Sequence, residues 1–396
     1  MASQPEVVVL SGARTSIGDY GSALKDFSPT DLAARVVREA VSRAKVDPND
    51  VGHLVFGNVI HGEAKDMYLA RVACINGGLP QATPALTLNR LCGSGLQAIV
   101  GAAQTILLGD AQCAVAGGAE SMSRGAYCVP GLRWGQRMGD GGVVDMMVGA
   151  LTDPFDTIHM GVTAENVAAK WGISRTQQDQ FAVESHKRAV NAIQKGYFKE
   201  QILPIEIKTK KGTSLVDTDE HPRADASMEG MAKLRAVFNN DGSVTAGNAS
   251  GINDGAAAVV VMSERKAKEL GLTPLATIRA CASAGVDPGL MGMGPWPASE
   301  KALARAKLRR EEIDLWELNE AFAAQSLGVL RELRIPKNRV NVNGGAIALG
   351  HPIGASGTRI LVTLLHEMKR RDAKRGLATL CIGGGQGIAM VVESAA

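Results

Sequence analysis

Two cysteines and one histidine of this sequence lie in glycine-rich segments, where a tight turn can expose a reactive side chain to a ligand. Cys92 lies in Leu91-Cys-Gly-Ser-Gly95, directly before a pattern of apolar residues with helical spacing. The dipole and unpaired N–H groups of a helix N-terminus favour a thiolate, so Cys92 is a candidate nucleophile. The competing interpretation is a buried core cysteine, because cysteine is among the residue types most often found inside proteins.

Two further positions suggest acid–base chemistry. His351 lies between Gly350 and Pro352 in a glycine-dense loop, which is poor for core packing and suited to presenting an imidazole. Cys381 closes an apolar run and precedes three glycines, whose N–H groups can line an anion-binding concavity. Taken singly, His351 is also compatible with a structural histidine and Cys381 with a buried strand residue.

The pair Asn319-Glu320 follows a predicted strand and opens a predicted helix, where both residue types are also good helix caps. The cysteines form no CxxC pair and the histidines show no metal spacing, so we expect no disulfide framework and no metal. The segment 93–98 matches the dinucleotide-binding fingerprint GxGxxA only loosely. The Cys92 thiol would stand where the loop that binds a pyrophosphate needs backbone alone, which argues against a nucleotide site here.

Composition narrows the class of partner. A length of 396 residues suggests two to three domains. A hydrophobic content of 45% is enough to form more than one core. A net charge of +3 and an aromatic content of 4% argue against nucleic acid or an anionic membrane as the main partner. We find no leader segment and no apolar stretch of the roughly 20 residues that a membrane span needs, and therefore expect a cytoplasmic protein.

The order of predicted elements is repeated in the two halves of the chain. The first series is strand 86–91, helix 96–108 and strand 113–116, and the second is helix 358–371 and strand 378–382. Each series places a reactive side chain at the turn before its helix, Cys92 in one and His351 in the other. A duplicated α/β unit with an approximate two-fold axis would bring these two helix N-termini together.

The segment 121–245 is richer in methionine, tryptophan and charge, and it reads as an insertion. We predict an N-terminal α/β half over 1–120, a loop domain over 121–245, completion of the first half over 246–272, and a C-terminal half over 273–396. Within the third segment we expect a short helix at 256–258 followed by a strand at 259–262.

Taken together, the motifs resemble those of thiolases. Leu88–Leu96, Asn319–Phe322, Gly350–Gly357 and Cys381–Gly387 occur in the thiolase order, and Thr245–Gly251 matches as well. The resemblance covers essentially the whole chain and is strongest to bacterial acetyl-CoA acetyltransferases and short-chain β-ketothiolases. It implies an α/β fold of duplicated halves in α-β-α-β-α layers, with mixed, mostly parallel sheets and an inserted loop domain that covers the coenzyme A site.

The resemblance also implies the chemistry. The enzyme would condense two acetyl-CoA molecules to acetoacetyl-CoA and CoA, and run the reverse thiolysis, by a ping-pong mechanism through acyl-Cys92. His351 would take the Cys92 proton, and Cys381 would act as acid and base on the second substrate. His351 and a water held by Asn319 would form one oxyanion hole, and the N–H groups of Cys92 and Gly383 the other.

Coenzyme A enters as a substrate, with no permanently bound cofactor. By matched motif, its contacts would be Leu151, His159, Met160, Arg223, Phe238, Ala246, Ala249, Ser250 and Phe322. The segment 127–145 resembles a tetramerisation loop, which predicts a homotetramer. Trp296 departs from the family pattern, since a small aliphatic residue is common there, and this raises a question about packing beside Met291 and the size of the acyl pocket.

Three alternatives remain at this stage. A degradative 3-ketoacyl-CoA thiolase of broader chain length shares the fold and chemistry. A non-catalytic acyl-CoA or lipid carrier would be expected to lack Cys92, His351 or Cys381, and all three are present. A cysteine hydrolase would give Cys381 and the duplicated halves no role.

Overall fold

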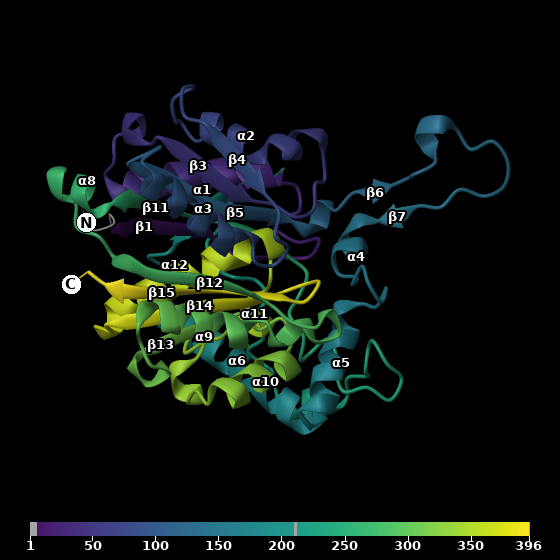
Figure 1. Cartoon of the computed structure of the whole chain (residues 1–396). Coiled ribbons are helices and arrows are strands. Elements are labelled where there is room, and N and C mark those ends of the chain that lie inside the picture. The colour runs from purple at the N-terminus through teal and green to yellow at the C-terminus, as the bar shows by residue number, and fades with distance from the viewer. Residues whose placement is uncertain (1–5, 210–211, 396) are drawn as a thin grey trace.

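The computed structural model describes residues 6–209 and 212–395, and two helices lie at its centre between layers of strands (Figure 1). These are α3 (Ser94–Leu108) and α12 (Ile353–Arg371), whose apolar side chains pack with those of the strands on both sides. Helices α1 and α2 cover the outer face of one layer of strands, and α9 and α10 cover the outer face of the other. The predicted α/β class and α-β-α-β-α layering are confirmed.

The bounds of the elements are as follows. The helices are α1 (Pro29–Ala44), α2 (Leu69–Asn76), α3 (Ser94–Leu108), α4 (Met146–Ala150), α5 (Met160–Lys170), α6 (Arg175–Gln194), α7 (Met228–Ala232), α8 (Glu264–Glu269), α9 (Pro295–Ala306), α10 (Ala323–Leu333), α11 (Ala346–Leu349) and α12 (Ile353–Arg371). The strands are β1 (Val7–Thr15), β2 (Gly18–Asp19), β3 (His53–Gly57), β4 (Ala85–Leu88), β5 (Cys113–Ser121), β6 (Tyr127–Cys128), β7 (Val144–Asp145), β8 (Ile202–Leu203), β9 (Ile205–Thr209), β10 (Gly212–Val216), β11 (Asn253–Ser263), β12 (Ala276–Gly285), β13 (Leu315–Leu318), β14 (Arg375–Ile382) and β15 (Gln386–Ser394).

The main strands follow the order β13-β14-β15-β12-β1-β11-β5-β3-β4. A short antiparallel contact between β1 and β12 (Val8 with Thr277, Val9 with Ala276) joins the strands of the two halves. Parallel pairs lie toward the two ends of this order, β13 with β14 and β3 with both β4 and β5. Antiparallel pairs lie toward the middle, where β11 contacts β1 and β5, and β15 contacts β12 and β14, so the sheet is mixed.

Several predicted boundaries are wrong for tertiary reasons. The expected helix at 256–258 is part of β11, because β1 and β5 pair with that segment on both sides and outweigh its alanine-rich helix propensity. The strand expected to reach residue 91 ends at Leu88, because Leu91 has a positive φ of 45° and turns the chain. The two central helices begin earlier than predicted, and include glycines that helix propensity alone disfavours.

Those glycines allow the central helices to approach closely. The Thr358 hydroxyl of α12 donates to the Gly95 carbonyl of α3 at 2.9 Å. A Cβ on Gly95 would stand 2.7 Å from the Thr358 nitrogen, and a Cβ on Gly357 would stand 2.3 Å from the Leu96 nitrogen. Backbone-to-backbone contact at this crossing brings together the N-terminal ends of α3 and α12, and with them the turns that carry Cys92 and His351.

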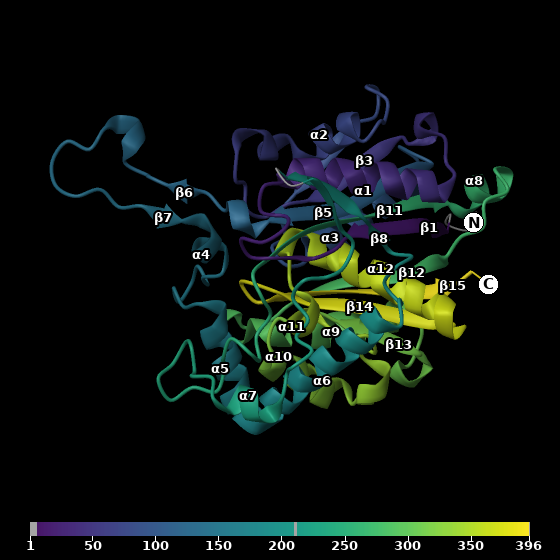
Figure 2. The same ribbon diagram turned by 180° about the vertical axis from the view of Figure 1, so that it is seen from behind.

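The chain leaves the strands at Ser121 and returns at Asn253, where the neighbouring residue Asp254 pairs with Ser121. The hairpin β6–β7 projects away from the body of the molecule (Figures 1 and 2). Farther along the excursion, Asp219 receives two hydrogen bonds from the buried guanidinium of Arg14 on β1, at 2.7 and 2.9 Å. This buried ion pair fastens the segment between β5 and β11 to the C-terminal end of β1.

One window among the described residues, Leu91–Leu108, is long and apolar enough to cross a membrane by length and composition. It consists of α3 and the turn before it, and half of it is buried inside the protein. Helix α3 packs against α12, β5 and β3. Its apolar character is therefore explained by its place between the layers.

Candidate active site

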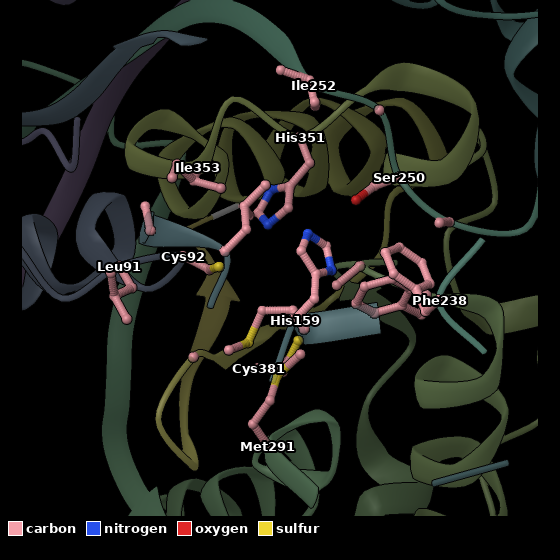
Figure 3. A pocket seen from close by; sticks show the side chains of 18 of the residues that line it. Leu91, Cys92, His159, Phe238, Ser250, Ile252, Met291, His351, Ile353 and Cys381 are labelled. Atoms are coloured by element: carbon pink, nitrogen blue, oxygen red, sulfur yellow. The ribbon is translucent and has the colours of Figure 1, made fainter. Parts of the chain in front are cut away.

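The turns before α3 and α12 meet at a cavity of about 310 Å³ (Figure 3). Its lining is mainly apolar and includes two cysteines and two histidines. The lining residues are Leu91, Cys92, Met122, Ala150, Leu151, His159, Met160, Val237, Phe238, Thr245, Ala246, Ala249, Ser250, Gly251, Ile252, Met291, Ala321, Phe322, His351, Ile353, Cys381 and Gly383. Such a concave apolar site with a few polar groups is typical of a small-molecule binding site.

Cys92 stands on a tight turn between β4 and α3. The Ser94 hydroxyl donates to the Leu91 carbonyl at 2.7 Å and accepts the Arg90 N–H at 2.8 Å, which fixes the turn. A Cβ on Gly93 would stand 2.5 Å from the terminal methyl of Ile382, so a larger residue at that position would require the Ile382 side chain to move. The Cys92 thiol is thereby held at the cavity wall, beside the His351 ring in Figure 3.

The protonation state of Cys92 differs from the one predicted from its place before a helix. Burial raises the pKa of the thiol to about 11, and hydrogen bonds from the backbone N–H groups of Gly383 and Cys92 offset only part of that rise. Desolvation disfavours the charged form more than the helix terminus favours it. The resting side chain is therefore a neutral thiol, and it needs a base to become a nucleophile.

Nε2 is the unprotonated nitrogen of His351, and its lone pair accepts the Asn319 amide N–H at 3.4 Å. The Ser356 hydroxyl donates its single proton to the Pro352 carbonyl at 2.9 Å, so its contact of 2.6 Å with His351 Nδ1 requires Nδ1 to be the donor. Burial, with a smaller contribution from the Arg359 charge, lowers the pKa of His351 to about 3. The imidazole is neutral, and its Nε2 can accept a proton.

Asn319 lies behind His351 and does not line the cavity. It is buried, its backbone N–H donates to the Thr379 carbonyl at 3.0 Å, and its Nδ2 lies 3.4 Å from His351 Nε2. Within the described part of the chain, its Oδ1 has no hydrogen-bond partner. The helix-cap interpretation is wrong, because α10 begins at Ala323 with Phe322 as its N-cap.

Glu320 instead fixes the turn that carries Asn319, through hydrogen bonds to its carboxylate. Its carboxylate receives hydrogen bonds from the Ser185 hydroxyl at 2.7 Å, the Asn341 amide at 2.8 Å and the Ile347 N–H at 3.2 Å. These contacts hold the Asn319-Glu320 turn against α6 and the segment before α11.

Cys381 is fully buried at the end of β14, on the same cavity as Cys92. Burial and the neighbouring Cys92 sulfur both raise the pKa of the Cys381 thiol. Two sulfur atoms, the Nε2 lone pair of His351 and the N–H groups of Cys92 and Gly383 are thus gathered in one apolar cavity. Groups of these kinds are the ones that nucleophilic catalysis with acid–base assistance and oxyanion stabilisation requires.

The far wall of the cavity is formed mainly by the excursion between β5 and β11. The His159 ring stacks on Phe238 with centroids 4.6 Å apart, and Phe238 meets the edge of Phe322 at 6.4 Å. The Ser250 N–H donates to the Ala321 carbonyl at 3.0 Å, which ties this wall to the Asn319 turn. All of the predicted coenzyme A contacts line this cavity except Arg223.

Arg223 and Trp296 both lie away from the cavity. The Arg223 side chain is 64% exposed and sits 4.0 Å from Asp19. Trp296, at the start of α9, is half-buried against the apolar cluster that contains Met293 and Ala298. Trp296 is therefore not among the residues that line the cavity, whereas Met291 is one of them.

Sequence reasoning missed the residues that hold the catalytic turns. Glu120, at the end of β5, accepts the N–H groups of Ile60 at 3.0 Å and Gly354 at 2.9 Å, and so bridges the two halves beside His351. Ser356 stands five residues after His351, in the same motif and in the first turn of α12. Glu120 lies too far from its partners in sequence to give such a signal.

The fold and this site define a protein of the thiolase family, to which the chain belongs. Residues 7–265 match the thiolase N-terminal domain, and residues 272–394 match the thiolase C-terminal domain. The chain is 59% identical over 389 residues to the β-ketothiolase BktB of Cupriavidus necator, covering 98% of this chain and 99% of that protein.

Solved structures agree with this assignment. The acetyl-CoA acetyltransferase of Bacillus anthracis superposes with a TM-score of 0.97 at 46% identity, covering 100% of both chains. Human mitochondrial 3-ketoacyl-CoA thiolase in complex with CoA superposes with a TM-score of 0.97 at 45% identity, again over 100% of both chains.

Proposed function

We propose that this protein is an acetyl-CoA C-acetyltransferase that joins two acyl-CoA molecules to a 3-ketoacyl-CoA and free CoA, and catalyses the reverse thiolysis. The observation that supports this most directly is the meeting of Cys92, Cys381 and the Nε2 lone pair of His351 in one apolar cavity. The names of the related β-ketothiolase and acetyl-CoA acetyltransferase agree with it.

The first half-reaction follows from the protonation states. His351 Nε2 takes the thiol proton of Cys92, and the sulfur attacks the thioester carbonyl of the first acyl-CoA. The N–H groups of Cys92 and Gly383 stabilise the oxyanion. When the tetrahedral intermediate collapses, the C–S bond to CoA breaks and the Cys381 thiol gives its proton to the departing sulfur. Acyl-Cys92 remains, with Cys381 as a thiolate and His351 holding the former Cys92 proton.

The second half-reaction needs a carbanion. Cys381, as a thiolate, removes a proton from the carbon next to the thioester of the second acyl-CoA. His351 and a water held by Asn319 stabilise the enolate oxygen. The carbanion attacks acyl-Cys92, the new C–C bond forms, and the Cys92 sulfur leaves and takes back the proton held by His351. This ping-pong sequence assigns a separate task to each cysteine.

Coenzyme A is proposed to lie along the wall that carries the His159–Phe238 stack and Ser250, with its thioester at Cys92. The solved human relative in complex with CoA supports a CoA-binding role for this fold. In this assignment, Arg223 meets the nucleotide end outside the cavity, where its exposed charge can reach a phosphate.

The test is thiolysis of acetoacetyl-CoA, 3-ketovaleryl-CoA and a longer 3-ketoacyl-CoA by the wild type, Cys92→Ser and Cys381→Ser. Cys281→Ser serves as the control, because Cys281 lies on β12 away from the cavity lining. Cleavage of the short substrates, lost in both active-site variants and kept in the control, is expected. Faster cleavage of the longer substrate would favour the degradative alternative, and no cleavage by folded wild type would favour a carrier.

We further propose that the chain forms a homotetramer through the hairpin β6–β7 and the loop that joins its strands. Trp134 is 90% exposed and Met138 is 91% exposed on this projecting segment, which favours burial in an assembly. Light scattering after size-exclusion chromatography should give four chains for the wild type and fewer for Trp134→Ser. A monomeric wild type at micromolar concentration would contradict the proposal.

We propose a cytoplasmic location for this enzyme. The mechanism needs Cys92 and Cys381 as free thiols, and a reducing compartment keeps thiols free. All six cysteines are free in the structure, which agrees with this proposal. Fractionation of the native host, followed by immunodetection of the protein in the soluble fraction, would test it.

A further inference from the structure

The backbone of His351 is held by a side chain from a distant part of the sequence. Asn253, the first residue of β11, is fully buried, and its Oδ1 accepts the His351 N–H at 2.9 Å. Its Nδ2 donates to the Gly18 carbonyl at 3.1 Å and to Asp19 at 3.3 Å. A single amide therefore connects the turn before α12 to the edge formed by β2.

The fit between Asn253 and this turn leaves little freedom. Gly350 has a φ of 103°, and a Cβ at that position would stand 2.5 to 2.7 Å from the Asn253 amide group. The amide therefore packs flat against the Gly350 backbone while it accepts the next N–H. Loss of the amide would remove the hydrogen bond to His351 and leave a space beside Gly350.

Asn253 is also connected to the coenzyme A side of the cavity. Ser250, Gly251 and Ile252, which directly precede it, line the cavity. Its partner Asp19 hydrogen-bonds His221, in the same loop as Arg223. Asn253 therefore connects this wall to the backbone of His351 through its own side chain.

We propose that Asn253 is a positioning residue for His351, which holds the imidazole in place beside Cys92 and couples that placement to the wall that holds coenzyme A. This inference rests on the proposed catalytic role of His351. Ser356 fixes the ring through Nδ1, and Asn253 fixes the backbone from which the ring extends. Both constraints are needed because a misplacement of about 1 Å can cost about 100-fold in rate.

The experiment compares Asn253→Ala, His351→Ala and the double variant in two assays, thiolysis of acetoacetyl-CoA and the rate of Cys92 alkylation by iodoacetamide. We expect Asn253→Ala to lower kcat about 10- to 100-fold with a much smaller change in KM, and to slow alkylation. In the His351→Ala background, the same substitution should have no further effect on alkylation, because it acts through His351.

Asn343→Ala is the matched control. Asn343 is an equally buried asparagine that donates to Glu367 and does not contact His351, so kcat should stay near that of the wild type. If Asn253→Ala does not fold, Asn253→Ser replaces it, since the shorter side chain cannot reach both His351 and Gly18, and the same result is expected.

The outcomes separate the two proposals. Wild-type thiolysis and alkylation in His351→Ala would overturn the proposed role of His351 itself. Loss of activity in His351→Ala combined with near-wild-type kcat in the Asn253 variant would overturn this inference alone. Additive effects on alkylation in the double variant would also overturn it, because Asn253 would then act by a route that does not include His351.

Discussion

The close crossing of α3 and α12 makes Gly357→Ala a sharp test of how the catalytic turns are brought together. The added Cβ would stand 2.3 Å from the Leu96 nitrogen, 2.9 Å from the Leu96 Cβ and 3.1 Å from the Gly95 carbonyl carbon. Two of these three neighbours are backbone atoms of a helix, so no side-chain rotation can relieve the contact. An ordinary contact distance requires the helices to separate by roughly 1 Å.

That separation moves the Cys92 turn relative to the His351 turn. Overpacking of this kind costs about 1–3 kcal/mol of stability, and a misplacement of about 1 Å can lower kcat about 100-fold. The cavity wall that carries Phe238 lies away from the crossing, so KM for acetoacetyl-CoA should change little. Thiolysis kinetics and thermal unfolding of the purified variant measure the two effects.

Gly101→Ala provides the matched control on the same helix. A Cβ at Gly101 would meet only the Val55 side chain, at 3.5 Å, which is an ordinary contact. Replacement of a mid-helix glycine by alanine should then stabilise the protein by about 0.5–1 kcal/mol with kcat unchanged. Wild-type kcat in Gly357→Ala, or equal losses in both variants, would refute the view that this crossing sets the catalytic geometry.

Other changes should have separable effects. Asp219→Asn leaves the buried Arg14 guanidinium without its counter-charge, so the free energy of unfolding measured with urea should fall by about 3–5 kcal/mol; a loss below 1 kcal/mol would show that the pair does not anchor the excursion. Phe238→Ala removes the stack on His159 and should raise KM for acyl-CoA about 10-fold with kcat retained; an unchanged KM would exclude this wall as the coenzyme A site. Burial lowers the pKa of His186 to about 4 and that of His351 to about 3, so between about pH 6.5 and pH 4 the unfolded chain binds protons that the folded chain does not. Stability should therefore fall as the pH drops through this range and be independent of these groups above it. Unfolding titrations of His186→Gln should show a slope against pH that is smaller by about one proton, or 1.4 kcal/mol per pH unit, and an unchanged slope would contradict the assigned shift.

The sequence by itself determined the chemistry-bearing positions. Cys92, His351 and Cys381 each stand next to glycines within a few residues, because a tight turn at the end of a strand needs small neighbours in the chain itself. The repeated order of strand, turn and helix likewise indicated the duplicated α/β halves, and the resemblance to thiolases implied the layered arrangement. These features depend on contacts between residues that are close in sequence, so local patterns reveal them.

The tertiary structure decided the state in which those residues work. Burial in the assembled cavity makes Cys92 a neutral thiol despite its place before α3, and Ser356 settles which nitrogen of His351 carries the proton. Pairing with β1 and β5 makes a strand of the alanine-rich segment 256–258. Asn253 contacts His351 across a separation of 98 residues. Desolvation, strand pairing and long-range hydrogen bonds depend on which segments meet in space, and no local spacing in the chain records that.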